Sequence, residues 1–215
     1  MKNIAFIINP MSGTQNKRRL PKLIVELLDK RQWLENIVFS QQAGQTAVLA
    51  RQYATMGFDA VVAVGGDGTV REVAEGVAGT QTALGIIPMG LTNTLARHLG
   101  IPLRGNTSIA WLNRSEPLLC DTLAVQIDNR PTIVAACSVK TDEQQFVNCM
   151  QGMKTSIQDG EMECVTATDT RISQSPEHVD ICGRTVIDGE EYEVEQSLTV
   201  SVIPDNLHIL APKRF

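Results

Sequence analysis

The chain has 215 residues, 43% of them hydrophobic, so it can form one large domain or two modest ones around a real core. Its net charge of −5 argues against binding to nucleic acid or anionic lipid by bulk attraction, so any membrane contact must be local. Five cysteines without a C-x-x-C pair indicate reduced thiols in the cytoplasm, and three scattered histidines show no metal-site spacing.

The first part of the chain alternates short apolar runs with amphipathic segments. The apolar runs, which predict buried strands, are 4–8, 37–39, 60–64 and 84–87. The segments with apolar residues at helical spacing are 18–29, 45–56, 70–78 and 92–99. This alternation predicts right-handed crossovers and a mainly parallel, Rossmann-like α/β sheet. Since ligands of such sheets bind at the carboxyl ends of the strands, the turns after Ile8, Val64 and Ile87 are expected to share one rim.

The pattern changes after about residue 115, where short strand-like segments and turn signals follow one another. The predicted strands are 123–127, 132–137, 163–166, 178–182, 191–195 and 198–203. Asp188-Gly189 is a hairpin signal, whereas 143–150 is interpreted as helical. We therefore expect an α/β domain over 1–120 and a smaller, mostly antiparallel β domain over 121–215.

Gly65-Gly66-Asp67-Gly68-Thr69, directly after a buried strand, carries the strongest functional signal. Glycines let the backbone approach a ligand closely, and the helix that follows points N–H groups and a partial positive charge at it. Phosphate is the expected ligand, and Asp67 would help to hold a magnesium ion that neutralises its charge. The structural alternative is a tight turn in which Asp67 and Thr69 act only as helix caps.

A second motif, Asn9-Pro10 with Ser12-Gly13, lies on the same predicted rim. Taken alone it is a polar turn, and its position favours a role in binding. A basic run, Lys17 to Arg19, follows it. Such a run is usually a solvated helix face, and a role in phosphate binding is the alternative.

Three ordered motifs carry a resemblance to a known family. They are Asn9-Pro-Met-Ser-Gly13, Gly65-Gly-Asp-Gly-Thr69 with Glu72-Val73, and Gly85-Ile-Ile-Pro-Met-Gly90 with Asn93 and Ala96-Arg97. Over residues 1 to about 125 the chain resembles the catalytic domain shared by diacylglycerol kinases, sphingosine kinases and YegS-like lipid kinases. The glycine-rich motif is also similar to those of NAD kinases and phosphofructokinases, which implies their fold for the α/β domain.

The resemblance implies an ATP- and Mg²⁺-dependent lipid kinase of phospholipid metabolism, cytoplasmic and in transient contact with the inner membrane surface. It implies nucleotide-binding roles for a set of rim residues. These are Asn9, Pro10, Ser12, Gly13, Ser40, Gly65, Gly66, Asp67, Gly68, Thr69, Val70, Arg71, Glu72, Gly90, Leu91 and Asn93. It further allows a homodimer, which no feature of the sequence indicates, and it implies no nucleic-acid partner.

In the second domain the resemblance assigns two more groups of residues. Ser156, Asp159 and Glu161 would hold a structural Mg²⁺, the first and last through backbone oxygens. Glu190 would accept the proton of the lipid hydroxyl, with Asp188 beside it and Asp67 as the third catalytic residue. A base at this point is chemically reasonable, because a lipid hydroxyl is a poor nucleophile until it loses its proton. From the residues alone, however, this segment is a hairpin turn with solvated acids.

The chain departs from the family pattern in ways that support a second hypothesis. Leu91 replaces a hydroxyl residue, Thr92 replaces a glycine, and Arg71 stands where asparagine is common. Thr92 would resist a positive φ. The region between about 139 and 155 is shortened, which reduces the lipid-facing part of the second domain. The alternative is therefore a catalytically impaired nucleotide-binding or scaffold protein, with a soluble-substrate kinase such as an NAD kinase as the third.

Overall fold

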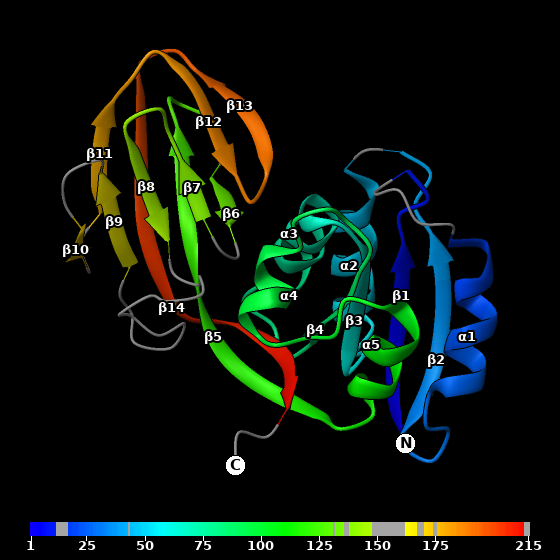
Figure 1. Ribbon diagram of the computed structural model, residues 1–215. Helices are drawn as coiled ribbons and strands as arrows, with labels where there is room; N and C mark the ends of the chain where they lie inside the picture. The colour runs from blue at the N-terminus through cyan, green and yellow to red at the C-terminus, as the bar shows by residue number, and fades with distance from the viewer. Residues whose placement is uncertain are drawn as a thin grey trace. The chain divides into compact units, whose positions relative to one another are not determined.

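The computed structural model describes residues 1–11, 17–42, 44–130, 132–135, 138–147, 162–166, 170–173 and 176–212. The chain divides into two compact units, which Figure 1 shows with their elements. Unit 1 comprises residues 1–118 and 207–215, and unit 2 comprises residues 119–206. The end of the chain therefore returns to the unit in which the chain began.

Unit 1 is an α/β unit built on parallel strands. Its strands are β1 (Lys2–Ile8), β2 (Trp33–Phe39), β3 (Ala60–Gly65), β4 (Ala83–Pro88) and the last part of β14 (Ser197–Pro212). They are ordered β2-β1-β3-β4-β14, and each neighbouring pair is parallel. Its helical segments are η1 (Lys17–Arg19), α1 (Leu20–Leu27), α2 (Gln45–Thr55), α3 (Asp67–Val77), α4 (Thr94–His98) and α5 (Gly105–Leu112).

Helices cover both faces of this sheet, so its central strands are buried from end to end. Alternate residues of β1, namely Ile4, Phe6 and Ile8, pack in one core cluster with α1 and α5. Helices α2 and α3 pack against each other and against β3, and α3 also contacts β4. Burial on both faces explains why β3 and β4 are continuous apolar runs rather than alternating ones.

The predicted fold class is confirmed: a mainly parallel α/β sheet precedes an antiparallel β unit. Helix α5 was not predicted, because Gly105 and the polar residues after it are weak helix formers. Tertiary contacts stabilise it: Ile109 and Leu112 are fully buried in the unit 1 core. Within the described residues no helix is both long and apolar enough to cross a membrane.

Unit 2 consists of β-strands in two sheets. The elements not yet named are β5 (Ser115–Ile127), β6 (Ile133–Ala135), β7 (Ser138–Lys140), β8 (Gln144–Val147), β9 (Met162–Thr166), β10 (Thr170–Ser173), β11 (Glu177–Asp180), β12 (Gly183–Ile187) and β13 (Glu190–Val194). One sheet pairs β11 with β14, β14 with β5, and β5 with β6. The other is antiparallel throughout, in the order β10-β9-β8-β7-β12-β13.

The two sheets of unit 2 share one hydrophobic core. Leu123 and Val125 of β5 pack in a cluster with Phe146 of β8 and Ile187 of β12. The helix predicted over 143–150 is wrong where the structure describes it, because Gln144–Val147 is strand β8, paired with β7 and β9. Phe146 of β8 is fully buried. Packing of this side chain against the core therefore decides the conformation of the segment, and local propensity does not.

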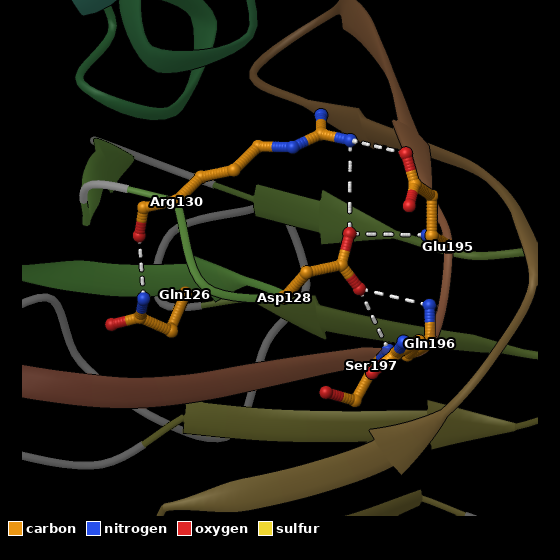
Figure 2. Close-up of polar contacts among 6 residues, drawn as sticks. All are labelled: Gln126, Asp128, Arg130, Glu195, Gln196 and Ser197. Carbon is orange, nitrogen blue, oxygen red and sulfur yellow. Dashed lines mark hydrogen bonds and ion pairs between the residues drawn. The ribbon is translucent and has the colours of Figure 1, made fainter.

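The turn after β5 is tied to the start of β14 by the carboxylate of Asp128 (Figure 2). This carboxylate accepts hydrogen bonds from the backbone N–H groups of Glu195, Gln196 and Ser197, at 3.1, 2.8 and 3.0 Å. Arg130 lies 3.7 Å from both Asp128 and Glu195. These N–H groups, that of Ser197 most of all, hold the pKa of Asp128 below its usual range.

We expect the substitution Asp128→Asn to lower the urea midpoint of unfolding at neutral pH. Asparagine accommodates the positive φ of 48° at this position but lacks the charge that the three N–H groups solvate. Because the folded-state pKa is lowered, this stabilisation is complete above the unfolded pKa of about 4 and is lost as the pH falls through the folded value. The difference between wild type and variant should therefore shrink below about pH 4. Glu193→Gln, an exposed carboxylate on β13, is the control, and parallel pH profiles for Asp128→Asn would contradict the prediction.

Candidate functional site

The loops that follow β1, β2, β3 and β4 meet at one rim of unit 1. Ser40, after β2, donates its N–H to the carbonyl of Ile8 at 3.0 Å. Asn9, after β1, donates its N–H to Val64 at 3.2 Å, and Met89, after β4, donates to Gly65 at 2.7 Å. The rim expected from the sequence is thus formed by backbone hydrogen bonds between neighbouring strands.

Helix α3 begins at this rim with its N-terminus uncapped by a side chain. Gly66 is the N-cap residue, and it provides no side-chain cap for the helix. The first hydrogen bond of the helix runs from the N–H of Val70 to the carbonyl of Gly66, at 3.0 Å. The N–H groups of Gly68 and Thr69 therefore have no partner within the helix. Such an end attracts anions through its N–H groups and its dipole.

The loops after β3 and β4 touch each other backbone to backbone. A Cβ atom added to Gly90 would lie 2.6 Å from Cα of Gly66 and 3.0 Å from Oδ1 of Asn93. A Cβ added to Gly66 would lie 3.3 Å from Cα of Gly90. The close approach thus requires glycine at position 90 and leaves little room for a side chain at position 66, so the loops meet through their backbones at the helix N-terminus.

Asp67, the first residue of α3, links the loop after β3 to the loop after β4 by hydrogen bonds. Its Oδ2 accepts the N–H of Asn93 at 2.9 Å, and its Oδ1 accepts the N–H of Thr94 at 2.6 Å. Burial raises the pKa of this carboxyl group, and the N–H groups of Thr94 and Asn93 act in the opposite direction. Asp67 therefore braces the loop that faces its helix, and the N–H of Asp67 itself also lowers the pKa of its carboxyl group.

Asn93 completes this brace and accounts for the backbone shape of the loop after β4. Its side chain accepts the N–H of Gly90 at 2.9 Å and donates to the Gly90 carbonyl at 2.8 Å. The positive φ of the loop, 51°, falls on Asn93, which tolerates it, and not on Thr92. Leu91 is 81% exposed and so fills no part of unit 1.

The loop after β1 joins the same constellation through Asn9. Its Nδ2 donates to Oγ1 of Thr69 at 3.3 Å, and its Oδ1 accepts the N–H of Met11 at 3.0 Å. Lys17, only 6% exposed, donates its ammonium group to the carbonyl of Asn9. Sequence reasoning treated Lys17 as part of a solvated face; in fact it is buried beside the rim, where its charge suits an anion.

The remaining residues predicted to bind the nucleotide differ in their contacts and burial. Glu72 accepts the N–H of Gly44, at the start of α2, at 3.3 Å. Arg71 is buried and forms an ion pair with Glu75 at 3.2 Å. Val70 is buried in unit 1, and Pro10 is an exposed turn residue. Ser12 and Gly13 lie outside the described residues.

Lys17 is expected to make the protein more resistant to unfolding as the pH rises above 8. Burial lowers the pKa of its ammonium group from 10.5 to about 8 in the folded chain. Between these values the unfolded chain holds the proton and the folded chain has released it, so the free energy of unfolding increases with pH. A difference of this size corresponds to at most about 3 kcal/mol. The measurement is the urea unfolding free energy of wild type and Lys17→Met from pH 7 to 10.5, over which the wild-type value should rise relative to that of the variant.

A matched control for this prediction is Lys22→Met, because the Lys22 side chain on α1 is 81% exposed. Its difference from wild type should stay flat over the same pH range. A flat profile for Lys17→Met as well would contradict the prediction.

The candidate residues of unit 2 lie around the β12–β13 hairpin. Asp188 and Gly189 form its turn, with a φ of 45° at Asp188. The Asp188 carboxylate is buried and accepts the N–H of Ser138 at 2.8 Å. Glu190 begins β13, where it pairs with Ile187. The carboxylate of Asp188 thus helps to hold the hairpin against β7.

The predicted Mg²⁺ ligands Ser156, Asp159 and Glu161 lie outside the described residues. Within the part of the chain that is described, no group of three His, Cys, Asp or Glu side chains has the arrangement of a metal site. An oxygen ligand does exist at the rim. The Asp67 carboxylate accepts the N–H groups of Asn93 and Thr94, and carboxylate oxygens are of the type that a hard cation such as Mg²⁺ prefers.

Comparison with known proteins agrees with this geometry. The model of the family "Diacylglycerol kinase catalytic domain" matches residues 3–125. A diacylglycerol kinase of Bacillus subtilis is 35% identical over 104 residues, which are 47% of this chain and 34% of that protein. The "Probable lipid kinase YegS-like" of Pseudomonas putida is 39% identical over 83 residues, 38% of this chain and 28% of that protein. The matched part thus spans about a third of these relatives.

Solved structures share the fold over nearly the whole chain. A diacylglycerol kinase from Bacillus anthracis superposes with a TM-score of 0.76 at 14% identity, covering 99% of this chain and 98% of that one. An NAD kinase from Archaeoglobus fulgidus, solved in complex with ATP, superposes with a TM-score of 0.56 at 12% identity, covering 98% and 94%. At such identities the likeness establishes the fold alone.

Proposed function

Because the chain belongs to the diacylglycerol kinase catalytic-domain family, we propose that it transfers the terminal phosphoryl group of ATP to a lipid hydroxyl, such as that of diacylglycerol. The observation that carries this proposal is the backbone contact between Gly66 and Gly90 at the uncapped N-terminus of α3. Two loops that meet at glycines beside a helix N-terminus suit a chain of phosphates, whose oxygens accept N–H hydrogen bonds.

The proposed phosphate site is positive at its edge and rigid. Lys17 supplies a buried ammonium group, and the N–H groups at the start of α3 supply donors. Phosphoryl transfer needs mainly correct positioning and neutralised charge, so a prearranged set of donors is the main contribution that a protein can make. Mg²⁺, when bound, would neutralise further charge on the phosphates, with Asp67 as the rim residue suited to hold it.

The lipid hydroxyl would lose its proton to Glu190 as it attacks the phosphorus atom, and ADP would leave. This role comes from the likeness of Asp188-Gly189-Glu190 to the family pattern. The hydrogen bond from Ser138 to Asp188 supports a division of labour between the two acids. Asp188 would shape the hairpin, and Glu190 would act as the base.

The second candidate function is a nucleotide-binding protein without transfer activity. The exposed Leu91 favours it, because a leucine side chain at the position where the family pattern has a hydroxyl residue cannot hydrogen-bond to a nucleotide. The two candidates agree on ATP binding and differ on transfer. A soluble-substrate kinase would differ again, by phosphorylating NAD.

The test is transfer of labelled phosphate from ATP to lipids in mixed vesicles that contain diacylglycerol or a sphingoid base, with NAD as the soluble acceptor. We expect labelled lipid, and roughly 10²–10⁴-fold less of it for Glu190→Gln, since that is the usual loss when a general base is removed. Glu191→Gln, an exposed neighbour that lies 3.7 Å from Arg184, is the matched control and should stay active.

Calorimetric titration with ATP and Mg²⁺ separates the two candidates. Wild type and Glu190→Gln should bind ATP equally, because Glu190 is proposed to act on the acceptor. Binding without transfer to any lipid would favour the scaffold function, and labelled NAD would favour the soluble-substrate kinase. Sedimentation with the same vesicles measures the proposed transient membrane contact, and analytical ultracentrifugation measures the proposed homodimer.

A further inference from the structure

A hollow lies at the amino-terminal ends of β1 and β2, away from the rim formed at the carboxyl ends of the strands. Its volume is about 370 Å³, within the range typical of small-molecule sites. Its lining includes Lys2, Arg31, Trp33, Arg114 and Glu116. Strand β1 has seven residues, so about 20 Å of strand separates this hollow from the rim described above. The two sites therefore do not share residues.

The walls of this hollow are held by hydrogen bonds within the chain. Asn113, which also lines it, donates to the carbonyl of Leu27 at 2.8 Å and accepts the N–H of Asp29 at 2.9 Å. Gln32 donates to Oδ2 of Asp29 at 2.9 Å, and its carbonyl accepts the N–H of Lys2 at 2.8 Å. The amide side chains are thus engaged in holding the walls, and the hollow is formed before any ligand binds.

Positive charge gathers here in a chain that is negative as a whole. Three cationic side chains, those of Lys2, Arg31 and Arg114, line the hollow, against the carboxylate of Glu116 in the lining and that of Asp29 beside Arg31. In the described part of the chain the guanidinium of Arg114 forms no ion pair, and Lys2 lies 5.8 Å from the ring centre of Trp33. Unit positive charges that line a concave surface attract anions more strongly than the same charges on a convex one.

The helix ends near the hollow do not cancel this charge. Helices α1 and α5 both end beside it, and carbonyl groups at such ends are negative. These carbonyl groups are, however, already bonded: Leu27 to Asn113, Ile24 to the N–H of Leu28, and Trp111 to the N–H of Arg114. A helix end also carries only a partial negative charge, so the unit charges of the cationic side chains outweigh it.

Trp33 gives an independent sign of an incomplete site. It is 4% exposed, and its buried indole N–H has no hydrogen-bond acceptor among the described residues. A buried donor without an acceptor costs about 1–3 kcal/mol, and such costs are commonest where a group serves a function or a ligand is absent. The tryptophan also provides a fluorescent reporter in the wall of the hollow.

We propose that this hollow binds a small soluble anion with two or more negative charges, of the phosphate ester or polycarboxylate class. Arg31 and Arg114 would pair with the anionic groups, and Lys2 would supply a third positive charge. A soluble anion is indicated because three cationic side chains line this small hollow. This site is separate from the phosphate site at the N-terminus of α3.

The test follows the fluorescence of Trp33 in a Trp111→Phe background, because these are the only two tryptophans of the sequence. Pyrophosphate and citrate are titrated at constant ionic strength, without Mg²⁺ or nucleotide. We expect a saturable change, with affinity at least tenfold weaker in Arg31→Gln/Arg114→Gln. Lys22→Gln, which removes one exposed charge on α1, is the control and should leave the affinity unchanged.

Arg114→Lys distinguishes loss of charge from loss of folding as the cause of weaker binding. It keeps the positive charge and should therefore keep part of the affinity. Circular dichroism and the melting temperature verify that each variant is folded. Equal affinity in wild type and the double glutamine variant would overturn the proposal. So would a change that follows sodium chloride alone, or binding to anionic lipid vesicles in place of the soluble anions.

Discussion

Gly90→Ala is expected to weaken ATP binding by about tenfold or more and to lower the stability of unit 1 by about 1–3 kcal/mol. The added Cβ would stand 2.6 Å from Cα of Gly66, and backbone atoms cannot yield as a flexible side chain does. The loop after β4 must then move away from α3. That movement would break the Asn93 and Thr94 bonds to Asp67, so loss of binding and loss of stability share one cause.

Substitutions at two nearby positions serve as comparisons for Gly90→Ala. Gly66→Ala should have a smaller effect, because its Cβ would lie 3.3 Å from Cα of Gly90, a distance that a small shift relieves. Leu91→Ala should leave the stability unchanged, since Leu91 is 81% exposed. The measurements are calorimetric ATP titration and urea unfolding. Wild-type ATP affinity in Gly90→Ala would mean that the close approach of the two loops does not form the nucleotide site.

Gly76→Ala is expected to lower the free energy of unfolding by about 1–3 kcal/mol although alanine is the better helix former. Gly76 lies in the interior of α3, where α2 packs against it. An added Cβ would lie 2.5 Å from Cβ of Ala50, 2.6 Å from the carbonyl oxygen of Ala47 and 3.0 Å from the backbone nitrogen of Arg51. Two of these atoms belong to the backbone, so the helices must separate.

The sign of this change is the informative part of the measurement. Helix propensity alone predicts that Gly76→Ala stabilises α3 by about 1 kcal/mol, whereas helix contact predicts the opposite. Gln52→Ala, on the exposed side of α2, is the control and should be neutral or slightly stabilising. Increased stability of Gly76→Ala in urea unfolding would contradict the close packing of α2 and α3.

The parts of the fold predicted from sequence are those in which local pattern and tertiary burial agree. Strand β3 and helix α2 were predicted almost to the residue, because one is wholly apolar and the other has clear helical spacing and a glycine stop. Helix α5 and strand β8 were missed because their conformation depends on distant contacts. For Phe146, burial in the unit 2 core outweighs a local pattern that suggested a helix.

In the candidate site, too, the features that depend on consecutive residues were predicted, and those that depend on distant contacts were not. The glycine-rich turn after β3 was evident because its residues are consecutive. The partnership between Asp67 and the loop of Asn93 was not evident, since the two residues are 26 positions apart and are joined only by the fold. Lys17 was underestimated for a related reason: a basic run shows no sign of which member becomes buried.

The return of the chain to unit 1 has a consequence for its biosynthesis. Residue Ile209 of β14 pairs with Leu84, and Leu210 packs in the unit 1 core. The amino-terminal unit therefore cannot complete its sheet until more than two hundred residues have left the ribosome, after all of unit 2 has been made. Until then the edge of β4 lacks its neighbour and is open to pairing with other chains. A nascent chain that pauses before the unit 1 part of β14 is made should accordingly be a substrate for chaperones.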